Sequence, residues 1–529
     1  LVRRLEGLPL ALALAAGRAH VLSPQQILDR LGPRFALLES RSAAVPERHR
    51  TLRAALEWST DLLPEPLRLA FARLSVFRGD FTLEAAEAVT GDPLALDVLS
   101  ELRECSLLLG SEGGDGRRFR FLETIRELAE ERLDPADRAE LERRHATHFA
   151  ALAAEAEPRL HGPEGSAWFK KLALDYPNMR AVLERGARAP SLAPVALGLA
   201  RALRSFWFGS GPTRDVGALL PPLLAASSER TPDRAAALWA LALYRARYER
   251  VEAALPALEE SLAIWREVGN APMATGVVFT LAETLSRAGE DAAARARFEE
   301  GLALARASGD VRRLGWGLGA FAQHLFFQDE LDRARSLVEE SIAIHEPIDV
   351  PQHALEEWRL AQILQALGDR ARAEALAARS LETLRRLDFG NGVAQCQALL
   401  GRGRAAAGDA AAARALLLDA LAGFRRGDRP DYLAQTLLDL ASLAIATRDV
   451  TAARERLDEC ARLVRDRCEH LFRHRILVLE GDLARATGDV ARARSSYRAC
   501  LFDLETRRGW SRAASRSAAL AGLATLTPE

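Results

Sequence analysis

The sequence predicts an all-α protein: a solenoid of helix-pair repeats over residues 191–525, preceded by a small module of helices and one β-hairpin. Three observations support this fold class. Small residues recur about every 40 positions through the second half of the chain. Alanine and leucine supply most of the apolar residues, and aromatic residues make up only 6% of the sequence. β-Branched residues are too sparse for an extensive sheet.

Length and composition indicate a folded chain of several parts. A chain of 529 residues is too long for one hydrophobic core. Hydrophobic residues account for 49% and charged residues for 27%, which excludes disorder as the main state. The net charge of −1 provides no field that attracts nucleic acid or an anionic membrane. No apolar run reaches the roughly 20 residues that span a bilayer, and the five scattered cysteines favour a reduced, cytoplasmic setting.

The repeat is defined by two columns of small residues seven positions apart. Seven residues are nearly two helical turns, so both columns lie on one helix face, where we predict close repeat packing. The first column is Ala254, Ala294, Ala334, Ala373, Ala413, Ala453 and Ala493. The second column is Ser261, Gly301, Ser341, Ser380, Ala420, Cys460 and Cys500.

A third column precedes the first by twelve positions, which reaches back across a turn into the preceding helix. It comprises Ala242, Ala282, Ala322, Ala361, Gly401, Ala441 and Gly481. The turns carry Gly289-Glu, Gly368-Asp, Gly408-Asp and Gly488-Asp, where glycine ends one helix and aspartate caps the next. This pattern resembles the tetratricopeptide repeat (TPR), whose usual unit is about 34 residues. A weaker eighth unit contains Gly217 and Leu224; a generic alanine-rich bundle is the alternative interpretation.

Residues 49–135 have a different pattern. Helices are predicted over 51–62, 64–77, 82–89 and 94–105, and the glycines at 110–116 between two short apolar segments predict a hairpin. Helices followed by a hairpin suggest a winged helix. Its third and fourth helices present mainly acidic residues, which argues against DNA as a partner. These residues are Glu84, Glu87, Asp97, Glu101 and Glu104, with Arg103 as the basic exception.

Several segments resemble the signal-transduction ATPases with numerous domains (STAND), which have an NB-ARC-type nucleotide-binding domain. They are Gly7-Leu-Pro-Leu-Ala-Leu12, His49–Ser59, Leu74–Phe81, Phe121–Glu127 and Asp175–Leu183. The resemblance implies that residues 1–48 are the end of the nucleotide-binding domain and 49–135 the winged helix. Residues 136–190 would then be a helical linker to the TPR-like repeats of 191–525.

The resemblance also implies where nucleotide would be contacted. Pro9 would pack against adenine, and Glu123 occupies the sensor-motif position, where Leu122 replaces the family's histidine. No G-x-x-x-x-G-K-[ST] loop occurs in the sequence, so we expect no enzyme activity and no cofactor in this chain. ATP or ADP is expected for the full-length protein. Leu1 reads as the inside of a helix, so we expect that an N-terminal part is absent.

Together these patterns predict a sensor and regulatory fragment of a STAND-type protein. The solenoid would bind a protein or peptide effector on its concave face and control an ATPase and output domain in cis, with a nucleotide-dependent oligomer possible at full length. Two alternatives remain: a TPR scaffold without a nucleotide switch, and a DNA-binding transcriptional regulator that uses the winged helix. No membrane partner is expected.

Two histidine groups are candidate metal ligands. His145 and His148 lie one helical turn apart, and Cys468, His470 and His474 are close in sequence. Neither group has a clear further ligand at a suitable spacing. We therefore predict no metal site, with polar helix faces as the preferred interpretation.

Overall fold

The computed structural model describes residues 52–526 except 114–115, 161–163, 210, 347–349, 428, 466–468 and 507–511, together with isolated positions between 12 and 26. The chain divides into two compact units, Leu1–Ser228 and Glu229–Glu529. Across the described residues, helices dominate and the strands form one two-stranded sheet. No helix in this described part is long and apolar enough to cross a membrane.

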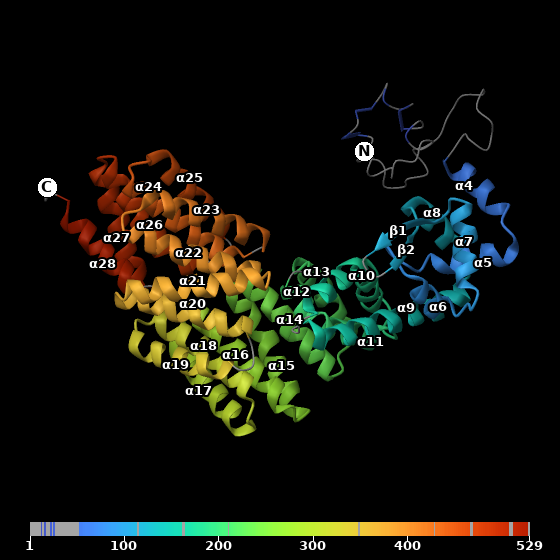
Figure 1. Ribbon diagram of the computed structural model, residues 1–529, viewed down its shortest axis with the longest axis horizontal. Helices are drawn as coiled ribbons and strands as arrows, with labels where there is room; N and C mark the ends of the chain where they lie inside the picture. The colour runs from blue at the N-terminus through green and yellow to red at the C-terminus, as the bar shows by residue number, and fades with distance from the viewer. Residues whose placement is uncertain are drawn as a thin grey trace. The chain divides into compact units, whose positions relative to one another are not determined.

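From residue 52, the first unit contains the helices and hairpin expected from the sequence (Figure 1). The elements are α4 (Leu52–Asp61), α5 (Glu65–Leu74), α6 (Leu83–Thr90), α7 (Ala95–Glu104), β1 (Leu109–Gly113), β2 (Gly116–Arg120) and α8 (Glu123–Glu131). The strands are antiparallel, with Leu109 opposite Arg120 and Gly113 opposite Gly116. Phe81, just before α6, forms an isolated antiparallel bridge with Phe119 of β2. This bridge ties the hairpin to the helices.

Helices of the predicted linker region and the region after it complete the first unit. They are α9 (Pro135–Ala156), the short 3₁₀ helix η2 (Glu157–Arg159), α10 (Gly165–Gly186), α11 (Ala193–Ala202), α12 (Arg204–Gly209) and α13 (Arg214–Ala226). The Asp134 side chain caps α9 by accepting a hydrogen bond from the Ala136 amide at 2.8 Å. Gly217 and Leu224, assigned to a weaker eighth repeat, both lie in α13.

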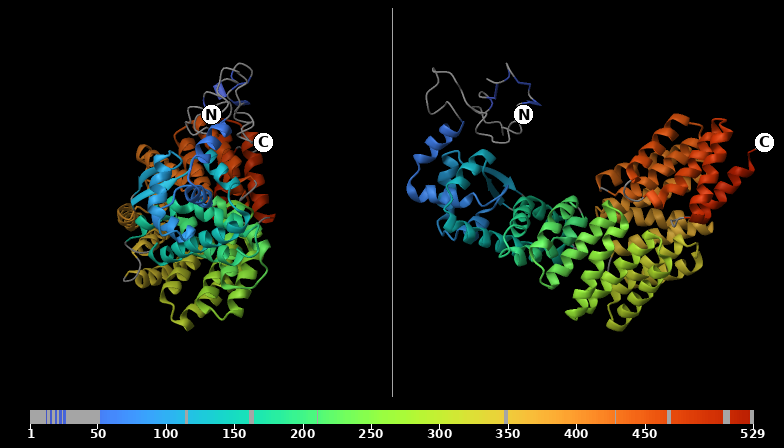
Figure 2. Two further views of the ribbon diagram at one scale, coloured as in Figure 1. Left: turned by 90° about the vertical axis from the view of Figure 1, so that its right-hand side faces the viewer. Right: turned by 180° about the vertical axis from the view of Figure 1, so that it is seen from behind.

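The second unit confirms the predicted TPR-like solenoid of helix pairs, which Figure 2 shows from behind. The first helices of the pairs are α14 (Pro232–Tyr248), α16 (Ala271–Ala288), α18 (Val311–Phe327), α20 (Val350–Leu367), α22 (Gly390–Ala406), α24 (Pro430–Ala446) and α26 (Glu469–Ala486). The second helices are α15 (Leu255–Glu267, after the 3₁₀ helix η3, Val251–Ala254), α17 (Asp291–Ser308), α19 (Leu331–His345), α21 (Arg370–Arg386), α23 (Ala410–Arg426), α25 (Val450–Val464) and α27 (Val490–Thr506). Helix α28 (Arg512–Ala524) packs against α26 and α27.

The turns between paired helices have the geometry that the sequence predicts. Gly368 and Gly408 adopt φ angles of 90° and 84°, in the left-handed region that glycine tolerates. The Asp369 and Asp409 side chains then accept hydrogen bonds from the backbone amides of Arg372 and Ala412. Together these residues end one helix of a pair and begin the next.

The two predicted small-residue columns are buried in every repeat. In four repeats the second column also makes a hydrogen bond to a backbone carbonyl 26 residues earlier. Ser341 Oγ, for example, donates to the Gly315 carbonyl at 2.8 Å. The corresponding pairs are Ser261 with Ala235, Ser380 with Ala354 and Cys460 with Ala434. In these four pairs, the second-column residue therefore joins the two helices through a hydrogen bond as well as through close packing.

The first repeat departs from the expectation that Ala254 and Ser261 share one α-helix. Ala254 is the last residue of η3, and α15 begins at Leu255. Pro256 lies in the first turn of α15. A proline there removes the amide hydrogen bond that would extend the helix backwards, because its ring nitrogen carries no hydrogen.

Candidate ligand-binding cavity

A cavity of about 510 Å³ lies within the second unit. Its lining comes mainly from the first helices of the pairs, from α14 to α26. Among the described residues, Phe298 of α17 and Phe424 of α23 are the contributions from second helices. The cavity is therefore formed mainly by the first helices of the pairs, which we call the inner helices.

The repeat determines which side chains reach this cavity. In five successive repeats, the residue that directly follows the third-column residue lines the cavity. In four of these repeats, the residue four positions further along lines the cavity as well. The first set is Leu243, Glu283, Gln323, Gln362 and Arg402. The second set is Arg247, Arg287, Phe327 and Ala366. The two sets share a helix face, because positions i and i+4 are neighbours on a helix.

Helices α14 and α24 are in contact, although η3 and the helices α15 to α23 come between them in the chain. Arg247 of α14 interacts electrostatically with Asp431 of α24 and with Arg429 just before it. The first helices of the first and sixth pairs therefore meet beside the cavity.

Three arginines act on one carboxylate at this meeting point. Arg429 binds Asp431 through two hydrogen bonds, Nε to Oδ1 at 3.2 Å and Nη2 to Oδ2 at 3.1 Å. The Arg429 guanidinium also lies 4.4 Å from the centre of the Tyr432 ring. Burial raises the pKa of Asp431, but Arg429, Arg287 and Arg247 together hold it well below its usual range. Asp431 is therefore a carboxylate at neutral pH.

Further ion pairs bind other arginines of the lining. Arg402 donates to Asp439 at 3.1 Å, and Asp439 also accepts from Arg475. Arg359 donates to Glu356, whose side chain is fully buried. In total, five arginines and two carboxylates line the cavity among the residues that the structure describes.

The lining also contains neutral polar and aromatic side chains. The His324 ring shares a hydrogen bond of 2.7 Å with Ser286 Oγ, and burial lowers the pKa of His324 to about 4, so the ring is neutral at pH 7. Trp358 Nε1 donates to the Gln395 carbonyl at 3.1 Å. Five glutamines lie among the described lining residues: Gln323, Gln362, Gln365, Gln395 and Gln435. The cavity can therefore bind ligand groups that donate or accept hydrogen bonds, as well as flat apolar groups.

The predicted site residues that the structure describes do not line the cavity. Pro9 is outside the described residues. Glu123 is the first residue of α8, where it accepts hydrogen bonds from Arg126 at 2.6 and 3.1 Å. The repeat-packing columns are buried between helices, and none of their residues lines the cavity as described. Sequence reasoning therefore missed the cavity residues, although the position after each third-column residue is a signal that could have identified them.

The candidate metal-ligating histidines have other surroundings. His145 is buried, with Nε2 3.2 Å from Asn178 Oδ1 and Nδ1 3.3 Å from Arg185 Nη1. Cys468 lies outside the described residues. His474 is buried in α26. Within the described ranges, no group of three or more histidine, cysteine, aspartate or glutamate side chains could hold a metal ion.

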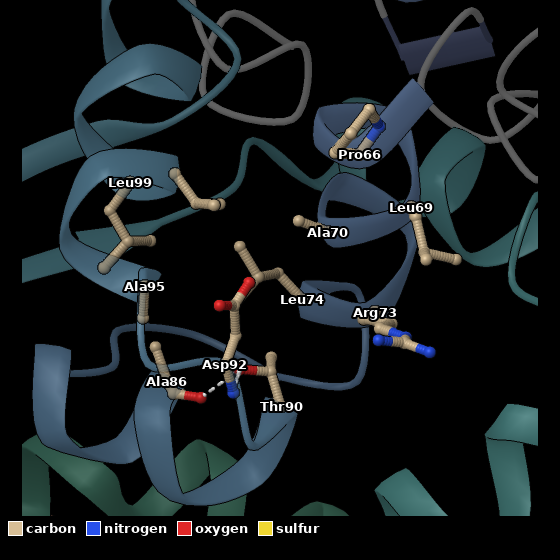
Figure 3. Close-up of a pocket in the computed structure, with 11 residues that line it drawn as sticks. Pro66, Leu69, Ala70, Arg73, Leu74, Ala86, Thr90, Asp92, Ala95 and Leu99 are labelled. Atoms are coloured by element: carbon tan, nitrogen blue, oxygen red, sulfur yellow. Dashed lines mark hydrogen bonds between the residues drawn. The ribbon is translucent and has the colours of Figure 1, made fainter. Parts of the chain in front are cut away.

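A second, smaller cavity of about 150 Å³ lies among α5, α6 and α7 of the first unit (Figure 3). Leu74 faces it from α5 and Ala95 from α7, while Arg73 points away. Arg73 instead donates to Asp137 at 2.8 and 2.9 Å. The lining is mostly apolar and the space is small, so this cavity has the character of a packing gap between three helices.

No family model matches the chain. A protein of Mycobacterium bovis, named as a candidate HTH-type transcriptional regulator, is 35% identical over 221 residues, which cover 40% of this chain and 24% of that protein. A counterpart from Mycobacterium tuberculosis gives the same values. An uncharacterized M. bovis protein is 35% identical over 144 residues, covering 26% of this chain and 37% of that protein. The chain thus spans about a quarter of the length of the first curated relatives that it matches.

Solved structures show more distant similarity. A STAND protein with a TPR sensor from Pyrococcus horikoshii has a TM-score of 0.49 and 14% identity, with 94% of this chain and 72% of that chain covered. A Rap protein complexed with competence and sporulation factor has a TM-score of 0.40 and 12% identity, covering 62% and 96%. Similarity at this level does not determine function.

Proposed function

We propose that this chain is the sensor and regulatory part of a larger STAND-type signalling protein. Its solenoid would bind an effector inside the cavity and, through the predicted winged helix, control an ATPase and an output domain. The observation that carries the proposal is the cavity of about 510 Å³, whose lining combines arginine, glutamine and aromatic side chains. Such a combination is typical of ligand sites, because polar groups orient a ligand whose apolar surface is buried.

The curated relatives favour a regulatory role. Those with the longest match are named as HTH-type transcriptional regulators and are about four times as long as the matched segment. We therefore propose transcription as the output of the whole protein. We also propose that this chain has no ATPase activity of its own, because its sequence contains no P-loop.

The test uses the complete gene product and does not require the effector to be identified. Gln362→Trp places an indole inside the cavity, whereas Arg306→Trp places one on the exposed face of α17. If the solenoid controls the ATPase, filling the cavity changes ADP or ATP affinity and the exposed substitution does not. Equal nucleotide affinities for wild type and Gln362→Trp would reject the sensor role. The remaining hypothesis would then be a TPR scaffold without a nucleotide switch.

Direct DNA binding by the predicted winged helix is the second candidate, favoured by the names of the relatives. The exposed acidic side chains of α6 and α7 oppose it, since they would repel a duplex. In the hairpin, Arg117 is exposed but paired with Glu112, and Arg118 is buried. A salt-dependent shift of duplex DNA by the intact chain that Arg120→Gln weakens would support this candidate; no shift at low salt would reject it.

A further inference from the structure

We propose that the groove between α5 and α7 of the first unit binds an amphipathic helix of a partner protein, one with arginine or lysine beside its apolar face. The inference goes beyond the proposed function, because it assigns a partner to the predicted winged helix. It does not involve the cavity of the second unit.

The groove consists of two hollows that follow one another along the contact between α5 and α7. The smaller cavity described above takes its α5 lining from residues 66–74 and its α7 lining from residues 95–99 (Figure 3). A shallow hollow takes its lining from residues 62–67, at the start of α5, and from residues 101–105, at the end of α7. The lining positions rise along α5 as they fall along α7, so the two hollows form one groove between antiparallel helices.

Large apolar side chains are exposed along this groove. Trp58 and Leu62 line the shallow hollow and are 50% and 66% exposed. Leu69 lines the smaller cavity and is 45% exposed. Of the nineteen large apolar side chains that are exposed in the described part of the chain, six lie between Trp58 and Leu109. Single exposed leucines are normal on a folded protein, whereas a group of them around a groove indicates a binding surface.

The α7 side of the groove is acidic. Glu101 and Glu104 line the shallow hollow, and Asp97 lies one turn before Glu101 on the exposed side of α7. None of these three carboxylates has a hydrogen-bond or ion-pair partner among the described residues. Arg103, the basic residue of α7, lies beside Gly110 of β1 and does not line the groove. The groove therefore presents negative charge next to exposed apolar surface.

This combination indicates the chemistry of the partner. Two adjacent helices form a groove into which the side chains of a third helix can pack. An amphipathic helix lays its apolar face into such a groove through residues three and four positions apart. Each helix of the groove has ten residues, so the groove is about 15 Å long and accommodates roughly three turns of a partner helix.

Each part of the groove matches a different part of that helix. The smaller cavity of about 150 Å³ has room for one apolar side chain, since a cavity of this size can hold benzene. Arginine or lysine beside the apolar face would pair with Glu101 and Glu104. The same carboxylates would repel the phosphates of a nucleic acid.

The experiment uses the whole chain and two designed helical peptides of about 15 residues as probes. Both have leucine at every third or fourth position; one has arginine at the other positions and its counterpart has glutamate. Fluorescence anisotropy of the labelled peptides measures affinity. Cys105, an exposed free thiol that lines the groove, reports the position of binding through its rate of alkylation by N-ethylmaleimide, followed by mass spectrometry. We expect the arginine peptide to bind saturably and to slow this alkylation several-fold, and the glutamate peptide to do neither.

Matched variants separate the groove from the general charge of the protein. Glu101→Gln combined with Glu104→Gln removes two charges from the groove, and Glu84→Gln combined with Glu87→Gln removes the same charge from the exposed side of α6. We expect the first pair to weaken binding of the arginine peptide about fivefold and the second pair to leave it unchanged. Asp97→Asn combined with Glu104→Gln replaces the first pair if circular dichroism shows that it does not fold.

The apolar part of the groove has its own matched pair. Leu62→Ser removes an exposed apolar side chain from the groove and should weaken binding about fivefold. Leu96→Ser removes one of similar exposure that lines neither hollow, so we expect no change in affinity.

Several outcomes would overturn the proposal: no binding of the arginine peptide, equal affinity for the two peptides, equal effects within either matched set of variants, or bound peptide that leaves Cys105 alkylation unchanged. Duplex DNA that protects Cys105 as the arginine peptide does would assign the groove to nucleic acid instead. None of these measurements involves nucleotide affinity, so the sensor role is tested separately.

Discussion

Arg118 of β2 and Asp175 of α10 form a buried ion pair, with 1% and 5% of their side chains exposed. The pair joins the hairpin of the first unit to a helix 57 residues later in the chain. Removal of either side chain should lower stability, because the other would lose this counter-charge in a low-dielectric interior. The hairpin is therefore held to α10 as well as to Phe81.

Replacement of Asp175 tests this link. Asp175→Asn keeps the shape of the side chain but removes the negative charge opposite Arg118. We expect the free energy of unfolding of the first unit to fall by about 3–5 kcal/mol, the range for one partner lost from a buried pair. Urea denaturation followed by circular dichroism measures the change. Arg117→Gln, in the exposed pair with Glu112, is the matched control, and a similar loss there would contradict the explanation.

Glu130 of α8 is bonded to three arginines, which make the stability of the folded protein depend on pH in the acid range. It accepts hydrogen bonds from Arg78 at 3.1 Å, from Arg126 and from Arg138 at 3.2 Å. Burial raises the pKa of Glu130, but the arginines, Arg78 foremost, lower it to about 2 from an ordinary 4.5. Because the folded-state pKa lies below the unfolded-state value, this contribution is complete above pH 4.5 and is lost as the pH falls towards 2.

Glu130→Gln should therefore destabilise the protein most at neutral pH. We expect a loss of about 2–3 kcal/mol at pH 7, from a pKa shift at about 1.4 kcal/mol per unit reduced for partial exposure, and almost none near pH 2. Urea unfolding at a series of pH values gives the difference between variant and wild type. Glu155→Gln, in an exposed pair with Arg159, should show no such pH-dependent difference. A Glu130→Gln difference that is constant with pH would refute the assignment.

The helix pairs and the hairpin could be predicted from the sequence because both depend on local patterns. Small residues seven positions apart indicate each helix pair, and glycine turns mark four of them, without reference to distant parts of the chain. Glycines between short strands specify the hairpin in the same way. Pro9 and the predicted remnant of the nucleotide-binding domain lie almost wholly outside the described residues, so both remain predictions.

Features that depend on distant segments could not be predicted. Arg118 precedes a buried Phe119 in β2, and alternation along a strand would place Arg118 on the solvent side. It is buried because Asp175 of α10 contacts it. The contact of α14 with α24 likewise depends on small rotations summed over several repeats, which bring Arg247 near Asp431. No local pattern encodes that sum.

The second small column predicts a repeat-specific hydrogen bond. Ser341→Ala removes the 2.8 Å bond to the Gly315 carbonyl and leaves a buried acceptor. We expect the free energy of unfolding to fall by about 1–2 kcal/mol. Ser341→Cys should recover part of it, because Cys460 contacts the Ala434 carbonyl at 3.7 Å in the equivalent position. Denaturation midpoints of the three proteins measure this order, and an alanine variant as stable as wild type would show that small size alone matters.

Gly301 tests how closely the repeats must pack. A Cβ atom added there would lie 2.5 Å from Cε1 of the fully buried Phe279 ring, a distance that forces movement. We expect Gly301→Ala to lower the free energy of unfolding by about 1–3 kcal/mol through overpacking, although alanine has a higher helix propensity than glycine. Phe279→Leu makes room at that point, so the double variant should be less destabilised than the sum of the two single variants. Additive losses in a double-mutant cycle of urea denaturation would mean that the ring does not limit this column to small residues.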